Sequence, residues 1–144
     1  MKQFLIAVLL ITSVLVKAQQ IVDFKVKNEG NTKERTYMLD LVRAEVYRNF
    51  SFEVKFVVDH FKVSNNYAWF EGSAQLKDGK PLVFGPDRTM DCCTVYTLFE
   101  KKNGIWNIAD FMSFCTDMCH WGIANRFPKA PKGIFPLDDV YFAE

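Results

Sequence analysis

Four cysteines and one histidine are the residues whose types and spacing most strongly suggest chemistry. Cys92 and Cys93 are adjacent, 21 residues separate them from Cys115, and Cys119 is followed directly by His120. Structural zinc sites usually contain cysteines two to four residues apart, whereas adjacent cysteines in a strand point to opposite sides of it. A Cys119 nucleophile with a His120 base is disfavoured, because sequence neighbours rarely face each other productively. The pattern therefore predicts disulfide bonds and indicates neither a metal nor an organic cofactor.

The cysteines lie at the open ends of a predicted β-hairpin. Strand-forming residues flank Asn103-Gly104, a dipeptide that suits a two-residue type I′ turn. In this turn Lys102 faces Ile105, and Lys101 lies beside Trp106. The same register predicts five further pairs: Tyr96 with Phe111, Leu98 with Ala109, Val95 with Met112, Phe99 with Ile108, and Thr97 with Asp110.

The hairpin register also predicts how the cysteines pair. Cys92 falls directly opposite Cys115, at a distance that a disulfide can bridge after a small adjustment. Cys93 points to the other face, and Cys119 lies beyond the strand end and can curl round to it. We therefore expect Cys92–Cys115 and Cys93–Cys119 bonds. A bulge in the hairpin would instead give Cys92–Cys119 and Cys93–Cys115 bonds.

Both faces of this hairpin are apolar, although a sheet with one helix on one face usually has a polar far face. Something must therefore cover the second face, and the sequence allows the C-terminal tail, a partner subunit or a ligand. The tail from 122 to 144 contains three prolines, which exclude a long helix, but it is too apolar to remain free.

The loop after the hairpin is the predicted binding edge. Disulfides would hold 116–118 rigid beside His120 and Trp121, so we name Thr116, Asp117, His120, Trp121 and Asp110 as candidate binding residues. Asp110 lies among apolar neighbours, where a carboxyl pKa tends to rise, and Asp110 or Asp117 is the candidate general base if the protein is an enzyme.

The N-terminus has the pattern of a secretory signal peptide. Lys2 precedes an apolar run, and Val16-Lys17-Ala18 is typical of a cleavage site. Residues 1–18 are thus the expected signal, and 19–144 a single domain. Without Lys2 and Lys17 the mature chain has 16 basic and 17 acidic residues, a balance that argues against a nucleic-acid partner. We expect a secreted or periplasmic protein with no stable membrane insertion.

Hydrophobic periodicity predicts one main helix and several strands. The run 33–49 contains no Gly or Pro, and its apolar residues follow helical spacing. Alternation predicts a short strand at 21–27, another at 50–63 whose apolar side switches midway as in a β-bulge, and a returning strand at 67–76. With the hairpin, these elements predict an α+β domain in which one helix packs on a curved antiparallel sheet of four or five strands. Their order is similar to cystatin-like and NTF2-like folds.

The chain also resembles a group of short exported bacterial proteins of uncharacterised function. The matching residues are Arg35, Leu39-Asp40 and Arg43; Phe56-Val57-Val58-Asp59, Phe61 and Val63; Tyr67-Ala68-Trp69-Phe70; Leu98-Phe99, Gly104 and Trp106; Thr116-Asp117 and Trp121; and Pro131 with Ile134-Phe135. The resemblance implies export but no activity, and the four cysteines are not part of its pattern.

Three functions fit this sequence. The first is a non-enzymatic exported module that binds a small apolar ligand or a protein partner in the cell envelope, for example as an inhibitor or immunity-type protein. The second is an enzyme with an NTF2-like pocket that uses Asp110 or Asp117 as its base. The third is a structural homodimer that buries the second sheet face. No phosphate-binding loop and no hydrolase motif supports a more specific activity.

Overall fold

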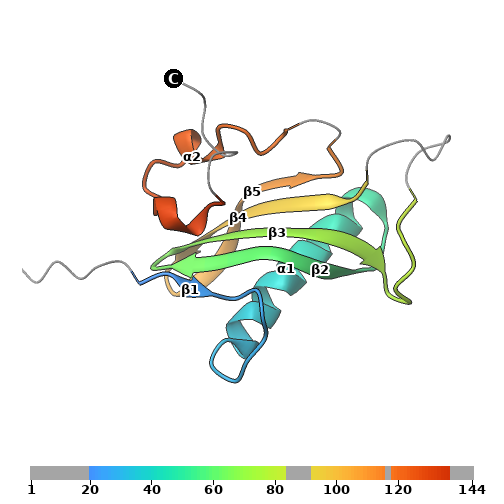
Figure 1. Cartoon of the computed structure of the whole chain (residues 1–144), viewed down its shortest axis with the longest axis horizontal. Coiled ribbons are helices and arrows are strands. Elements are labelled where there is room, and N and C mark those ends of the chain that lie inside the picture. Colours follow the sequence, from blue (N-terminus) through green and yellow to red (C-terminus); the bar gives the residue numbers. More distant parts are fainter. Residues whose placement is uncertain (1–19, 84–91, 116–117, 137–144) are drawn as a thin grey trace, which may run out of the picture.

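A five-stranded antiparallel sheet with one main helix forms the body of the protein (Figure 1). The computed structural model describes residues 20–83, 92–115 and 118–136. The strands follow one another across the sheet in chain order, so each is hydrogen-bonded to the next in sequence. The elements are β1 (Val22–Asp23), α1 (Thr32–Phe50), β2 (Val54–Ser64), β3 (Tyr67–Leu76), β4 (Thr94–Lys102), β5 (Ile105–Ser113), α2 (Ile123–Arg126) and the 3-10 helix η1 (Lys132–Ile134). The predicted α+β class is confirmed.

The first strand is shorter than predicted. Instead of 21–27 it covers two residues, because the Asp23 side chain accepts a hydrogen bond of 2.7 Å from the Lys25 backbone N–H. Such a local bond turns the chain away from an extended conformation.

Helix α1 begins and ends close to the predicted bounds of 33–49. At its start, Asn28 and Asn31 each accept the backbone N–H of the other through their side chains, at 3.0 and 2.9 Å. The helix ends at Ser51, which adopts a left-handed conformation with φ of 60°. Its buried face is formed by Met38, Leu39, Val42 and Val46. On the surface of the helix, Asp40 and Arg43 form an ion pair three residues apart.

Two register shifts bend the sheet. In β2 the shift falls between Val58 and His60, where the sequence predicts a bulge. A second shift, between Leu98 and Phe99 of β4, leaves Ala109 of β5 as the extra residue and was not predicted. Up to this point the predicted pairs are correct, including Phe99 with Ile108 and Lys101 with Trp106. Beyond it four predicted pairs are wrong by one residue, and the true pairs are Tyr96 with Met112, Leu98 with Asp110, Val95 with Ser113 and Thr97 with Phe111.

The two faces of the sheet carry separate apolar cores. On the α1 side, the rings of Phe61 and Phe70 meet edge to face with centroids 5.4 Å apart. On the other side, Trp69 and Leu98 are covered by apolar residues of the segment 118–136, namely Ile123, Ala124, Ala130, Ile134 and Phe135. Figure 1 shows α1 and this segment on opposite sides of the sheet. Of the three predicted covers for the second face, the C-terminal tail is therefore the one observed.

A hydrogen bond also joins the C-terminal segment to the sheet. The Nε2 atom of His60 lies 2.7 Å from the backbone oxygen of Ile134, and this geometry requires the ring nitrogen to donate. Burial lowers the pKa of His60 below its ordinary 6.5, while this hydrogen bond acts in the opposite direction. The neutral ring is thus the stable form at pH 7.

Removing the side chain of Ile134 tests the docking of this segment. Ile134 has no exposed surface, so Ile134→Ala should lower the free energy of unfolding by about 2–5 kcal/mol. Urea denaturation measures the change. The matched control is Ile105→Ala, because Ile105 is 57% exposed and its truncation should change the stability by less than about 0.5 kcal/mol. Equal stability of the two variants would show that the segment does not cover the sheet in solution.

Candidate functional site

All four cysteines form disulfide bonds, but their partners differ from both predicted sets. Cys92 pairs with Cys93, and Cys115 pairs with Cys119, whose Cα atoms are 6.1 Å apart. The hairpin explains why no cysteine bridges its two strands. Its last ladder bond joins the Phe114 N–H to the Thr94 oxygen, and the backbone at Phe114 then turns with φ of 55°. The strands therefore separate before they reach the cysteines.

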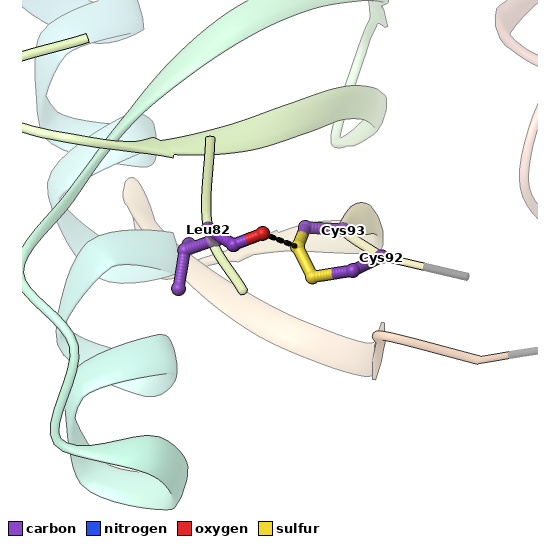
Figure 2. The surroundings of a disulfide bond; sticks show 3 residues. All are labelled: Leu82, Cys92 and Cys93. Carbon is purple, nitrogen blue, oxygen red and sulfur yellow. Dashed lines mark hydrogen bonds between the residues drawn. A yellow bond between two sulfur atoms is a disulfide. The ribbon is translucent and has the colours of Figure 1, made fainter. Parts of the chain in front are cut away.

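The Cys92–Cys93 pair lies against the α1-side core. Cys93 is 6% exposed, and its Sγ atom is 3.7 Å from the backbone oxygen of Leu82 (Figure 2). Leu82 belongs to the same core. This disulfide is thus a packing element, and together with the Cys115–Cys119 bond it leaves none of the described cysteines with a free thiol.

Tryptic mapping without reduction distinguishes the observed pairing from the predicted ones. Trypsin separates residues 89–101 from residues 103–126, and each peptide contains two cysteines. The observed pairing places both disulfides within single peptides, so the two peptides should be recovered separately. Recovery of one disulfide-linked pair of peptides would support the cross-strand bonds instead.

The predicted binding residues that the structure describes differ in exposure and in partners. His120 is buried, with its ring 4.3 Å from that of Tyr96, whereas Trp121 is about half exposed. The Asp110 carboxylate forms an ion pair of 2.7 Å with Arg126 and is 17% exposed. Thr116 and Asp117 lie outside the described residues. Within the described ranges no three His, Cys, Asp or Glu side chains cluster in a way that could hold a metal ion.

A hollow of the described surface lies elsewhere, between the start of α1 and the β4–β5 hairpin. We call it the α1–hairpin groove; it has a volume of about 620 Å³. Its lining residues are Gly30, Lys33, Glu34 and Tyr37 on the helix side, and Lys101, Gly104, Ile105 and Trp106 on the hairpin side. None of the predicted binding residues is among them.

A polar cluster joins the two sides of the groove. One oxygen of Glu34, Oε1, accepts a hydrogen bond of 2.8 Å from the indole nitrogen of Trp106 and also pairs with the ammonium of Lys101. The Lys101 Nζ atom is 5.0 Å from the centre of the Trp106 ring, within the range of a cation–π contact. Trp106 is 3% exposed, so these contacts satisfy a buried indole N–H.

The environment of Glu34 favours its ionised form. Burial alone would raise its pKa, but the hydrogen bonds from Lys101 and Trp106, together with the Lys101 charge, lower the pKa below the ordinary 4.5. The carboxylate is therefore charged at pH 7, and its charge is matched by Lys101.

The walls of the groove combine exposed apolar surface with one unmatched charge. Tyr37 on the helix side and Ile105 on the hairpin side are 45% and 57% exposed. Lys33 is exposed and has no ion-pair partner among the described residues. Gly104 adds no side chain, and its φ of 78° suits the turn.

A smaller groove of about 270 Å³ lies near the other end of α1, and Arg43, Tyr47 and Lys77 are among its lining residues. Lys77 is paired with Glu53 at 2.8 Å, and Arg43 with Asp40. This groove therefore lacks the unmatched charge and the buried indole of the larger one.

Sequence reasoning missed the α1–hairpin groove because its residues are far apart in the chain. Glu34 is 67 residues from Lys101 and 72 from Trp106. Two signals pointed to it without identifying it. One is the aromatic Tyr37 on the polar side of the predicted helix, and the other is Lys101 beside Trp106 in the predicted hairpin.

No family model, curated protein or solved structure matches this chain. Among the described residues, no helix is both long and apolar enough to cross a membrane. The functional argument therefore depends on the groove itself.

The Glu34 cluster predicts a pH-dependent contribution to stability. Because the folded-state pKa of Glu34 lies below 4.5, the stabilisation is present above this pH and is lost as the pH falls through the folded value. The side chains of Lys101 and Glu34 are 27% and 39% exposed, so Glu34→Gln should cost no more than about 1 kcal/mol at pH 7. Urea denaturation at pH 7 and at about pH 2.5 measures whether the difference disappears in acid, as protonation predicts.

Glu53→Gln is the matched control for this measurement, because both members of the Glu53–Lys77 pair are about two-thirds exposed. Its effect should be smaller at both pH values. A Glu34→Gln difference that persists in acid would contradict an electrostatic origin.

Proposed function

We propose that the protein is an exported, non-enzymatic binding module that takes up a small, mainly apolar ligand in the α1–hairpin groove. The main support for this proposal is the groove itself. Its volume of about 620 Å³ is within the range of about 300–1,000 Å³ common for ligand sites. Its walls expose Tyr37 and Ile105, and its polar groups are held in place by the Glu34 cluster.

The groove replaces the second sheet face as the proposed site. The sequence suggested that an apolar ligand or partner could bind that face, but residues Ile123, Ile134 and Phe135 already cover Trp69 and Leu98 there. None of the described residues covers the exposed apolar surface of Tyr37 on α1 and Ile105 on the hairpin in this way. The same groove could instead accept an apolar side chain of a protein partner. In that case the module would act as an inhibitor or immunity-type protein.

Two features support export to the periplasm or the cell exterior. Residues 1–18 have the pattern of a signal peptide, and all four cysteines are paired as disulfides, which persist mainly in oxidising compartments. The order of helix and strands is similar to cystatin-like and NTF2-like folds, but a fold alone does not define a function.

The enzyme alternative gains no support from Asp110. Its carboxylate is engaged by Arg126, and the groove is lined by other residues. Binding is therefore the function that the described geometry supports best.

A neutral apolar fluorophore tests the proposal. N-phenyl-1-naphthylamine should bind the purified mature protein, with a rise and a blue shift of its emission as it leaves water. Tyr37→Ala removes one aromatic wall and should weaken the affinity about three- to tenfold. Fluorescence titration measures the change.

Tyr47→Ala is the matched control, because Tyr47 is an exposed tyrosine on the same helix but lines the smaller groove. Its affinity should equal that of the unmodified protein. Absence of fluorophore binding, or equal weakening by both substitutions, would exclude the α1–hairpin groove as the site.

A further inference from the structure

We infer that the ligand of the α1–hairpin groove is a monocarboxylic acid with an apolar body, whose carboxylate is bound by Lys33. This inference depends on the proposed binding function and adds the chemical class of the ligand. It comes from the charges that line the groove and from the way in which they are already paired.

The groove has one positive charge in excess. Lys33 and Lys101 contribute two ammonium groups, and Glu34 contributes one carboxylate. Glu34 is paired with Lys101, so that charge is matched within the protein. Lys33 has no carboxylate partner among the described residues, and it lies in the first turn of α1, where the helix dipole also favours an anion. A ligand with one negative charge complements this arrangement.

A cationic ligand fits the groove poorly. Aromatic sites for cations use the open face of an indole or phenol ring, but the Lys101 ammonium already lies 5.0 Å from the centre of the Trp106 ring. The remaining free charge in the groove, on Lys33, would repel a second cation. The groove therefore selects against amines even though it contains two aromatic residues and a carboxylate.

A ligand with two or more negative charges is also disfavoured. Among the described charges that line the groove only Lys33 is unmatched, and the ionised Glu34 close by would repel a second negative group. Phosphate recognition typically uses several donors at once, and the groove offers no arginine. One carboxylate per ligand is the charge that the lining residues can neutralise.

The rest of the ligand must be apolar. Tyr37 and Ile105 form exposed walls, and the groove volume accommodates a fused aromatic ring system or a medium-length alkyl chain. Both aromatic and aliphatic acids combine one carboxylate with an apolar body. The displacement experiment below distinguishes these two classes of ligand.

Displacement of N-phenyl-1-naphthylamine by matched compounds tests the inference. The aromatic set is 2-naphthoate, 2-naphthylmethanol and 2-naphthylmethylamine, which carry a negative, a neutral and a positive group on the same rings. The aliphatic set is decanoate and decanol. In the unmodified protein each acid should displace the fluorophore at about a tenfold lower concentration than its alcohol, and the amine should be the weakest competitor. The acid with the lower half-displacement concentration identifies the ligand source.

Lys33→Gln should reduce the acid-to-alcohol preference to less than about threefold, because the unmatched charge is removed. The ratio within one protein is the readout, so a general change in affinity does not affect it. Lys129→Gln is the matched control: Lys129 is exposed, does not line the groove, and its removal should leave the preference unchanged.

Two results would overturn the carboxylate inference while leaving the binding function intact. One is equal displacement by acid and alcohol, or stronger displacement by the amine, in a protein that binds the fluorophore. The other is an acid preference that persists in Lys33→Gln. Direct binding of the two acids is measured by proton NMR line broadening. If neither the fluorophore nor either acid binds, the binding function and the inference are rejected together.

Discussion

Burial of β3 on both faces is the constraint on which the rest of the structure depends. Trp69 and Phe70 are adjacent, and neither has any exposed surface. Because successive side chains of a strand point to opposite faces, the sheet cannot leave either side open to water. Helix α1 covers the side of Phe70, and the segment 118–136 covers the side of Trp69. The protein is thus a three-layer arrangement in which the sheet is the middle layer.

This constraint also explains why the groove lies at an end of the helix. Both broad faces of the sheet are occupied, so among the described residues the α1–hairpin groove lies at the junction between α1 and the β4–β5 hairpin and not on the sheet. The Glu34 cluster fixes that junction through one carboxylate that contacts both Lys101 and Trp106. Such a cluster holds the two walls at a defined separation, and walls that are already ordered would lose less conformational entropy in binding the proposed ligand.

Local patterns predicted much of the fold, and their limits have physical reasons. The helix, the hairpin turn at Asn103-Gly104 and the bulge in β2 each leave a signal within a few residues of sequence. The bulge at Ala109 leaves no such signal, because the faces of β4 and β5 are apolar with or without a shift of one residue. That shift changed every predicted pair beyond the bulge. The disulfide partners and the groove could not be predicted, since they depend on where strands separate and on how α1 crosses the sheet.

The layer that covers Trp69 and Leu98 comes from the last part of the described chain, so its packing depends on contacts between residues far apart in sequence. The His60–Ile134 hydrogen bond spans 74 residues, and the contacts of Trp69 with Phe135 are similarly remote in sequence. Until the segment 118–136 packs on the sheet, Trp69 and Leu98 face solvent. Contacts between residues so far apart in sequence slow folding. The chain loses the entropy of closing a long loop before these contacts can stabilise it. A partly folded chain in which this segment has not yet packed exposes an aromatic face, and such exposed apolar surface favours aggregation.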